Sequence, residues 1–229
     1  MRKGDLEKLL EIMKSYEREM IKVLSALEKA NALHYCIITG SWAMYFYKKI
    51  FEDFVPRIET TDLDLYLPHP KRYKGDSVIE QFKKIHYLVH HDQFTGKTTF
   101  LSENGFEVEF LTIPDRTMTN TIAIKGMNVI AETLPLMAPV ERNYIEIRWN
   151  DLNIRVVSPV SFVLQKLLIY EKRKPAYKKE KDIEAIKYVL QYIKASKEYS
   201  LELQESLNSY PKKWKSTIIK NANINDIQL

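Results

Sequence analysis

The sequence has a single cysteine and lacks the features of exported or membrane-bound proteins. Cys36 alone cannot form an intramolecular disulfide, and most cysteine-rich metal sites are excluded with it. No stretch approaches the roughly 18 consecutive apolar residues of a membrane-spanning helix. The first residues, MRKGDLEKLLEIMKSYERE, mix both signs of charge with spaced leucines, unlike a signal peptide. We therefore expect a soluble, unprocessed protein in the reducing cytoplasm.

Several catalytic signatures are also missing. The segment TGKTT, residues 95–99, resembles the end of a phosphate-binding loop, but the earlier glycine of such a loop would fall on His91. His86, His90 and His91 lie near Asp92, yet no further spaced pair of ligands completes a zinc site. The sequence likewise contains no nucleophile elbow and no serine triad pattern. These absences argue against a P-loop NTPase, a zinc enzyme and a serine hydrolase.

Positive charge is present in excess and is unevenly placed. The chain has 229 residues, 45% of them hydrophobic, which is enough for a proper core. Its formal net charge is +5, and residues 151–229 contribute 15 Lys and Arg against 9 Asp and Glu. The densest basic runs are EKRKPAYKKEK and PKKWKSTIIK, in which aromatic residues lie among lysines. Such runs fit either a solvated surface or a phosphate-rich partner, a nucleotide or a nucleic acid.

Hydrophobic periodicity and turn residues predict an alternation of helices and strands followed by a helical region. The predicted elements are helices at 6–32, 41–51 and 77–85, strands at 34–39 and 61–67, a hairpin at 97–113 turning at Asn104-Gly105, a hairpin at 143–157 turning at Asn150-Asp151, and helices at 160–172 and 181–196. We divide the chain into a first domain of residues 1–157, which includes the amino-terminal helix, and a helical region of residues 158–229.

Two aspartates occupy alternate positions of the predicted strand TDLDLYL. Residues two apart in a strand point to the same face, so Asp62 and Asp64 project side by side while Leu63, Leu65 and Leu67 face the core. Two carboxylates so close repel each other unless a divalent cation lies between them. Mg²⁺ favours one or two carboxylates together with substrate phosphates. The strand therefore predicts a magnesium site that also holds a phosphorylated substrate.

A Gly-Ser pair precedes the predicted helix SWAMYFYKKIF. Gly40 would let the backbone approach a ligand closely, and Ser41 would act as the helix cap. Backbone N–H groups and a hydroxyl at the amino end of a helix favour anions such as phosphates. We therefore expect Gly40 and Ser41 to bind the phosphates of the same substrate.

A third carboxylate is expected from the strand FEVEFL of the first hairpin. Phe106, Val108 and Phe110 take one face of this strand, which leaves Glu107 and Glu109 on the other. We favour Glu109 because it lies deeper in the strand, and Glu107 is the reserve candidate. With Asp62 and Asp64, a third carboxylate could hold two metal ions, which clamp the attacking and leaving oxygens when they are about 4 Å apart.

The order of these motifs resembles a known family. An apolar strand, Gly-Ser at a helix start, the segment TTDLDLYL and a strand containing VEFL are similar to the nucleotidyltransferase fold shared with DNA polymerase beta. The later segment VVSPVSFVLQKLLIYEKRKPAYKKEKDIEAIKYVL resembles the downstream helices of minimal bacterial nucleotidyltransferases, including abortive-infection type toxins. The resemblance implies an α+β fold with a mixed β-sheet flanked by helices and a carboxy-terminal helical region.

The resemblance also implies an activity and further site residues. Members of the family transfer a nucleoside monophosphate from an NTP to an acceptor, with Mg²⁺ and release of pyrophosphate. A lysine on one helix and a Lys-Asp pair on the next complete the cleft, and by motif position these correspond to Lys166 and Asp182. We expect Lys166, with Arg173 or Lys172 nearby, to neutralise charge on the pyrophosphate. This chain departs from many members in having Gly-Ser for Gly-Gly and Glu for Asp as the third carboxylate.

The sequence leaves the chemical class of the acceptor undetermined. The basic tail and the segment HPKRYKG fit an RNA such as the end of a tRNA, whereas a protein side chain or a small-molecule hydroxyl fits equally well. A non-catalytic nucleotide-binding or partner-binding module of the same fold is the alternative function. An aminoglycoside-type resistance enzyme is a third possibility, which the basic tail disfavours.

Overall fold

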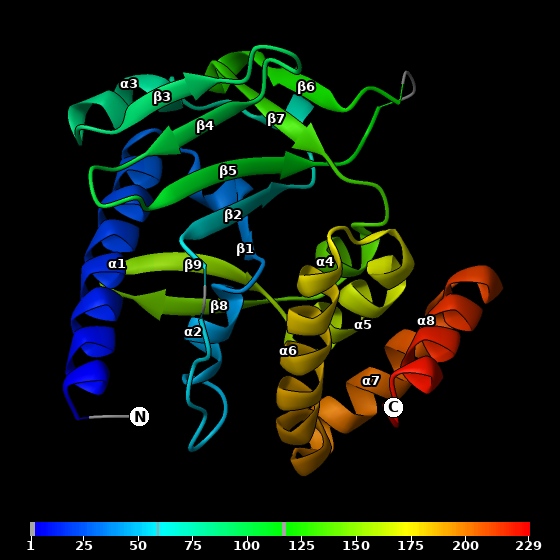
Figure 1. Ribbon diagram of the computed structural model, residues 1–229. Helices are drawn as coiled ribbons and strands as arrows, with labels where there is room; N and C mark the ends of the chain where they lie inside the picture. The colour runs from blue at the N-terminus through cyan, green and yellow to red at the C-terminus, as the bar shows by residue number, and fades with distance from the viewer. Residues whose placement is uncertain (1–2, 59, 116–117) are drawn as a thin grey trace. The chain divides into compact units, whose positions relative to one another are not determined.

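The computed structural model describes residues 3–58, 60–115 and 118–229 (Figure 1). The chain forms two compact units, each made of several segments. The first unit comprises Met1–Ile38, Glu59–Pro135 and Glu146–Arg155, and the second comprises Thr39–Ile58, Leu136–Ile145 and Val156–Leu229. The predicted division of the chain into domains after Val157 stays a prediction.

A mixed sheet forms the centre of the first unit. Its strands follow the order β3 (Leu88–His91), β4 (Thr98–Leu101), β5 (Glu107–Thr112), β2 (Asp62–Leu67), β1 (Ile37–Thr39), β9 (Leu152–Val157) and β8 (Tyr144–Trp149). Strands β2 and β5 pair in parallel, whereas β4 is antiparallel to β5 and to β3. Strand β7 (Val129–Thr133) pairs in parallel with β5 and antiparallel with β6 (Thr121–Ile124). The sheet confirms the predicted mixed topology.

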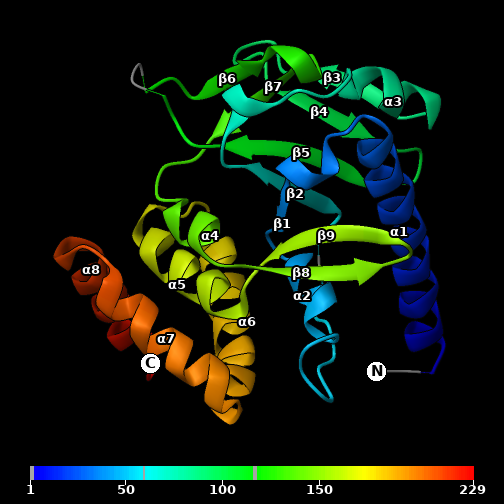
Figure 2. The same ribbon diagram turned by 180° about the vertical axis from the view of Figure 1, so that it is seen from behind.

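Helices α1 (Lys3–Lys29) and α3 (Val78–Lys84) pack against each other in this unit, as Figures 1 and 2 show from opposite sides. Ser77 caps α3 by accepting a hydrogen bond from the Glu80 backbone at 3.4 Å. The Phe82 ring of α3 lies 4.2 Å from the Phe100 ring of β4, measured between centroids. Phe82 and Phe100 are fully buried, so aromatic packing holds α3 against the sheet.

Helices make up most of the second unit. They are α2 (Ala43–Tyr47), α4 (Ala138–Arg142), α5 (Pro159–Ile169), α6 (Ala176–Ala195), α7 (Lys197–Ser209) and α8 (Lys212–Ile224). Helix α5 is central, because α4, α6, α7 and α8 all pack against it and most of its residues are buried. The side-chain amide of Asn221 in α8 donates a hydrogen bond to the Leu167 carbonyl of α5 at 2.8 Å. The predicted carboxy-terminal helical region is confirmed.

Several predicted boundaries differ from those of the structure. Helix α6 begins at Ala176, so much of the basic run before Asp182 is helical and not a loop. Helix α2 is shorter than predicted, and its N-cap is Trp42 without a side-chain hydrogen bond, so the prediction that Ser41 caps it was wrong. Hydrophobic periodicity and turn residues did not predict β6, β7 or α4. Within the described ranges, no helix combines the length and apolarity needed to cross a membrane.

Both predicted hairpin turns are confirmed, and each uses residues that tolerate a left-handed backbone. Gly105 has a φ of 81° between β4 and β5. Asn150 and Asp151 have φ values of 47° and 62° between β8 and β9. Asparagine, aspartate and glycine occupy this region more readily than other residues, which is why these turns could be predicted from the sequence.

Candidate active site

Four carboxylates lie together on one face of the first unit's sheet. In the parallel pairing of β2 with β5, Asp62 is opposite Glu107 and Asp64 is opposite Glu109. Because paired positions in adjacent strands share a face, these four residues form a block that we call the carboxylate quartet. The intervening leucines of β2, and Val108 of β5, are fully buried on the opposite face. The alternation predicted for both strands is therefore confirmed.

The negative charges of the carboxylate quartet act on Glu107. Burial raises the pKa of the Glu107 carboxyl above its ordinary value, and the negative charges of Glu109 and Asp62 raise it further. The ammonium of Lys97 opposes this rise, but the net direction remains upward. A site at which one carboxyl holds its proton more firmly because of its neighbours favours an added cation. The donor set, made only of carboxylate oxygens, matches the preference of Mg²⁺.

The beginning of β2 is held in place by the two threonines before it. The backbone N–H of Asp62 donates to Thr60 Oγ1 at 3.2 Å, and Thr61 Oγ1 donates to Asp62 Oδ1 at 3.2 Å. The backbone N–H of Glu107 donates to the Thr61 carbonyl at 3.0 Å, which extends the pairing of β2 and β5. These bonds set the position of Asp62 before any ligand binds.

Lys97 also belongs to this site, although the sequence pattern did not predict it. Its Nζ lies 2.6 Å from Glu109 Oε1 and 3.2 Å from Glu132 Oε2. Burial by itself lowers the pKa of the Lys97 ammonium, but hydrogen bonds and charge interactions with Glu109 and Glu132 outweigh burial and raise it overall. Lys97 therefore remains charged beside the quartet. Glu132 was also missed, although the alternation in VIAET offered a signal for a strand there.

The metal assignment stays a prediction. In the part of the chain that the structure describes, no group of three or more His, Cys, Asp or Glu side chains is arranged so that it could hold a metal ion. Glu109, the favoured third ligand, is bonded to Lys97. Glu107 lies opposite Asp62 in the same block, so both glutamates remain candidates for the third ligand.

In the second unit, Gly40 and Ser41 form a turn between β1 and α2. Gly40 has a φ of 65°, a conformation that favours glycine. The Gly40 carbonyl accepts from the Ala43 N–H at 3.3 Å, and the Ser41 carbonyl accepts from the Met44 N–H at 3.1 Å. Helix α2 has only five residues, so its dipole is short. A phosphate bound here would be held by the backbone of the turn and by the Ser41 hydroxyl. The dipole of a long helix, which the sequence predicted, would add little because α2 is so short.

The structure brings three other predicted residues together in the second unit. Lys166 of α5 forms an ion pair with Asp182 Oδ1 of α6, and Arg173 Nε lies 3.1 Å from Asp182 Oδ2. Lys166 is 8% exposed and Asp182 is 5% exposed, so this ion pair is almost fully buried. The Lys166 ammonium also lies 5.0 Å from the centroid of the Phe162 ring. The alternative to Arg173, Lys172, lies exposed in a 3₁₀ turn.

A mixed sheet with paired carboxylates on two parallel strands, together with a helical unit, defines a nucleotidyltransferase-like fold. A family model described as Nucleotidyltransferase matches residues 18–210, so the chain belongs to this family. The family confirms the resemblance found in the sequence and identifies the protein as an enzyme that transfers a nucleotidyl group. No similar sequence was found among curated proteins.

Three solved structures illustrate the likeness in fold. ANT(2")-Ia in complex with adenylyl-2"-tobramycin is 14% identical, covers 84% of this chain and 96% of its own, and has a TM-score of 0.47. An antigenic nucleotidyltransferase-like protein from Paracoccidioides brasiliensis is 16% identical, with coverages of 87% and 90% and a TM-score of 0.46. The lincomycin-bound lincosamide antibiotic adenylyltransferase LnuA is 17% identical, with coverages of 76% and 95% and a TM-score of 0.42. At these values the likenesses carry no argument about the acceptor.

Proposed function

We propose that the protein transfers a nucleoside monophosphate from an NTP to an acceptor hydroxyl and releases pyrophosphate. The observation that carries this proposal is the carboxylate quartet, formed by the register of β2 and β5. Asp62, Asp64 and Glu109 would hold Mg²⁺, two ions in the fullest form of the site, with Glu107 as the reserve ligand. When bound, Mg²⁺ would neutralise phosphate charge and lower the energy of the attacking and leaving oxygens.

The chain's own residues have distinct roles in this reaction. The acceptor hydroxyl oxygen bonds to the α-phosphorus of the NTP, and the bond from that phosphorus to the oxygen bridging to the β-phosphate breaks. A carboxylate of the quartet, Glu109 in our assignment, accepts the hydroxyl proton. The electron pair of the broken bond leaves with pyrophosphate.

Residues of the second unit would serve the phosphates. Gly40 and Ser41 offer backbone N–H groups and a hydroxyl to the terminal phosphates. Lys166 and Arg173, both bound to Asp182, would stabilise the negative charge that develops on pyrophosphate. Asp182 acts through these two cations as a positioning residue, since its carboxylate is enclosed by them.

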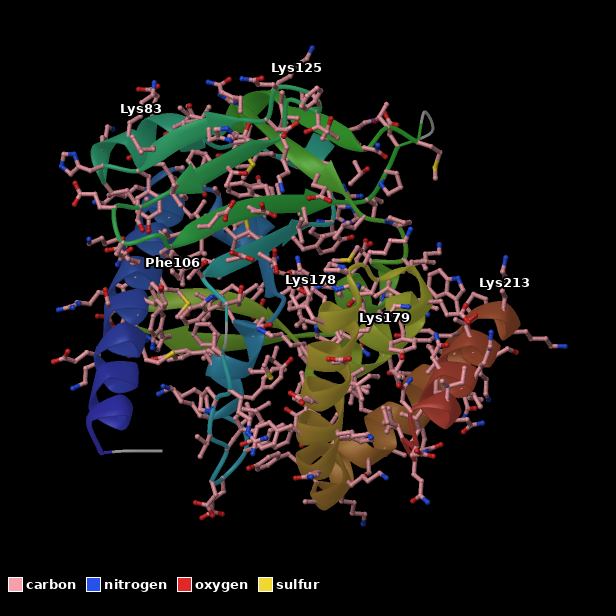
Figure 3. The ribbon with its side chains drawn as sticks, viewed as in Figure 1. Lys83, Phe106, Lys125, Lys178, Lys179 and Lys213 are labelled. Atoms are coloured by element: carbon pink, nitrogen blue, oxygen red, sulfur yellow. The ribbon has the colours of Figure 1, made fainter. Side chains whose placement is uncertain are left out.

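RNA is the acceptor class that the charge distribution favours. Figure 3 shows Lys178 and Lys179 on α6, which are partly exposed, and Lys213 on α8, which is exposed. Exposed cations attract a polyanion, and binding that depends on them weakens steeply as salt rises. A tRNA end fits this chemistry, whereas a protein side chain and a small-molecule hydroxyl are the alternative outcomes of the test below.

The test is a label-transfer assay. Purified protein with Mg²⁺ is incubated with each of the four α-labelled NTPs and with total cellular RNA, total protein or a small-molecule extract. Label should appear in one acceptor fraction and be absent with Asp62→Ala. Asp151→Asn is the matched control, because Asp151 is exposed in a turn whose left-handed backbone asparagine tolerates. A folded wild-type protein that labels no fraction with any NTP would contradict the proposal and favour the non-catalytic nucleotide-binding module.

A further inference from the structure

Lys97 is shared by a proposed metal ligand and a second carboxylate outside the carboxylate quartet. Its ammonium lies 2.6 Å from Glu109 Oε1 and 3.2 Å from Glu132 Oε2. The Lys97 side chain is 22% exposed, and those of Glu109 and Glu132 are 18% and 38% exposed. Because the contact with Glu109 is the shorter and less exposed of the two, Lys97 acts mainly as the counter-ion of Glu109.

The turn before β4 holds the backbone of Lys97 in place. The carboxylate of Asp92 accepts hydrogen bonds from the Phe94 N–H at 3.0 Å and from the Thr95 N–H and hydroxyl at 2.7 and 2.8 Å. Gly96 has a φ of 73°, and its N–H donates to the Asp92 carbonyl at 2.8 Å. The Asp92 N–H donates to the Lys97 carbonyl at 2.9 Å. A closed turn of this kind fixes the point from which the lysine side chain extends.

Sheet register explains why the two glutamates lie on either side of this lysine. Strand β4 pairs with the first part of β5, where Thr99 is opposite Glu109. Strand β7 pairs with the last part of β5, where Leu111 is opposite Glu132. Lys97 comes directly before β4, and its side chain reaches both strands. The lysine therefore has a partner inside the quartet and another outside it.

We propose that Lys97 is a positioning residue that neutralises Glu109 while no divalent cation is bound, and that cation binding transfers its ammonium from Glu109 to Glu132. This inference rests on the proposed function, in which Asp62, Asp64 and Glu109 hold the cation. A divalent cation bound to Glu109 would lie close to the Lys97 ammonium, which is 2.6 Å from Glu109 Oε1, and the repulsion between the two positive charges favours the contact with Glu132. The flexible four-carbon stem of lysine allows this small movement.

Glu132 gives the displaced ammonium a place to go. It already lies within ion-pair distance of Lys97, so the exchange leaves no buried, unpaired charge. Metal binding would then break the ion pair of Lys97 with Glu109 and keep the ion pair of Lys97 with Glu132. A salt bridge that only stabilises the fold would not exchange partners when a metal ion binds. Measurements of metal binding therefore distinguish a lysine that exchanges partners from one that only stabilises the fold.

The experiment measures Mn²⁺ binding to the full-length protein by calorimetry in the absence of nucleotide. Lys97→Met removes the competing charge at nearly constant length, and it should bind Mn²⁺ about tenfold more tightly, within the range over which groups next to metal ligands alter affinity. Lys83→Met is the matched control, because Lys83 is an exposed lysine of α3 paired with Glu80 and points away from the sheet in Figure 3. An affinity of Lys97→Met equal to or weaker than that of the control overturns the inference.

Glu132 provides a second variant with an effect of the opposite sign. Glu132→Gln removes the alternative partner of Lys97, so it should weaken Mn²⁺ binding by roughly threefold or more. In the Lys97→Met background the same substitution should change the affinity by less than about twofold, because the lysine through which it acts is gone. An equal loss in both backgrounds would show that Glu132 acts directly on the cation, and would overturn the exchange.

Thermal unfolding keeps the inference testable if calorimetry of Lys97→Met is limited by its stability. Without metal, Lys97→Met should unfold at a lower temperature than wild type, and saturating Mn²⁺ should raise its Tm more than it raises that of wild type. Equal rises in Tm contradict the inference.

Asp64→Asn separates the inference about Lys97 from the proposed function. If wild type binds no Mn²⁺, or if Asp64→Asn binds it equally well, the proposed metal site is wrong and the inference is wrong with it. If Asp64→Asn loses binding and Lys97→Met is unchanged, only the inference fails.

Discussion

The two units handle negative charge in opposite ways. In the first unit the carboxylate quartet collects four acidic groups on one half-exposed face, with Lys97 as a partial counter-ion. In the second unit one carboxylate, that of Asp182, is buried between Lys166 and Arg173. The first arrangement places four acidic groups on one face beside Lys97, whereas the second pairs a single carboxylate with two cations. A substitution in the quartet should therefore affect activity first, and a substitution at Asp182 should affect stability first.

The largest expected effect is that of Asp64→Asn on the proposed transfer. Removing one charge from the metal site should lower the rate by roughly a thousandfold, equivalent to about 4 kcal/mol in the barrier, because metal ions supply several kcal/mol of charge stabilisation. The fold should stay intact, because asparagine has nearly the size and shape of aspartate. The rate is measured by label transfer and the Tm by circular dichroism. A variant with an undiminished rate contradicts the metal assignment.

The second expected effect is that of Asp182→Ala on stability. This variant leaves the buried Lys166 ammonium without its counter-ion, which should cost about 3 kcal/mol in the free energy of unfolding. Urea denaturation measures the loss. The double variant Lys166→Met with Asp182→Leu should recover most of it, because neither charge remains buried. A loss below about 1 kcal/mol for Asp182→Ala would mean that the ion pair contributes no more than an exposed one.

A smaller effect is expected for Gly40→Ala. Alanine in the left-handed region should destabilise the fold by about 1 kcal/mol, because its Cβ approaches the following carbonyl oxygen. If the Gly40-Ser41 turn also binds the phosphates of the NTP, the KM of Gly40→Ala for NTP should be higher than that of wild type. Ser41→Ala is the companion variant, since Ser41 does not cap α2 and its loss should leave the Tm unchanged. An unchanged KM in both variants would remove the turn from the proposed site.

The smallest expected effect is a pH-dependent one at Glu202 of α7. Burial raises the pKa of this carboxyl, and the charge of Glu198 raises it further, although a hydrogen bond from Ser158 opposes the rise. The folded state thus holds the proton more tightly than the unfolded state, and stability falls as the pH rises from the unfolded pKa through the folded one. Glu202→Gln should be more stable than wild type at pH 8 and equal to it at pH 4.

The control for this comparison is Glu205→Gln, an exposed glutamate in the same helix. It should show the same difference from wild type at both pH values, measured as the midpoint of urea denaturation. A constant difference for Glu202→Gln as well would mean that Glu202 does not titrate differently in the folded and unfolded states.

The chemistry of individual strands was predictable because it depends on local alternation. The spacing of Asp62 and Asp64 predicted a shared face, and the same rule placed Glu107 and Glu109 together on their strand. The turns at Gly105 and at Asn150-Asp151 were predictable because few residue types accept a positive φ. Boundaries were less predictable: α6 begins early because Pro175 and the alanine after it start a helix that extends through the lysine-rich run.

What the sequence by itself determined is therefore the kind of chemistry: paired carboxylates on buried strands, a glycine turn, and a lysine and an aspartate on consecutive helices. The tertiary structure alone decided which groups meet. Only the parallel register of β2 with β5 sets Asp64 opposite Glu109, and only the pairing of β4 and β7 with the same strand brings Lys97 between Glu109 and Glu132. The pairing of Asp64 with Glu109 and the contact of Lys97 with Glu132 join strands that no short turn connects, so no turn sets the register between them.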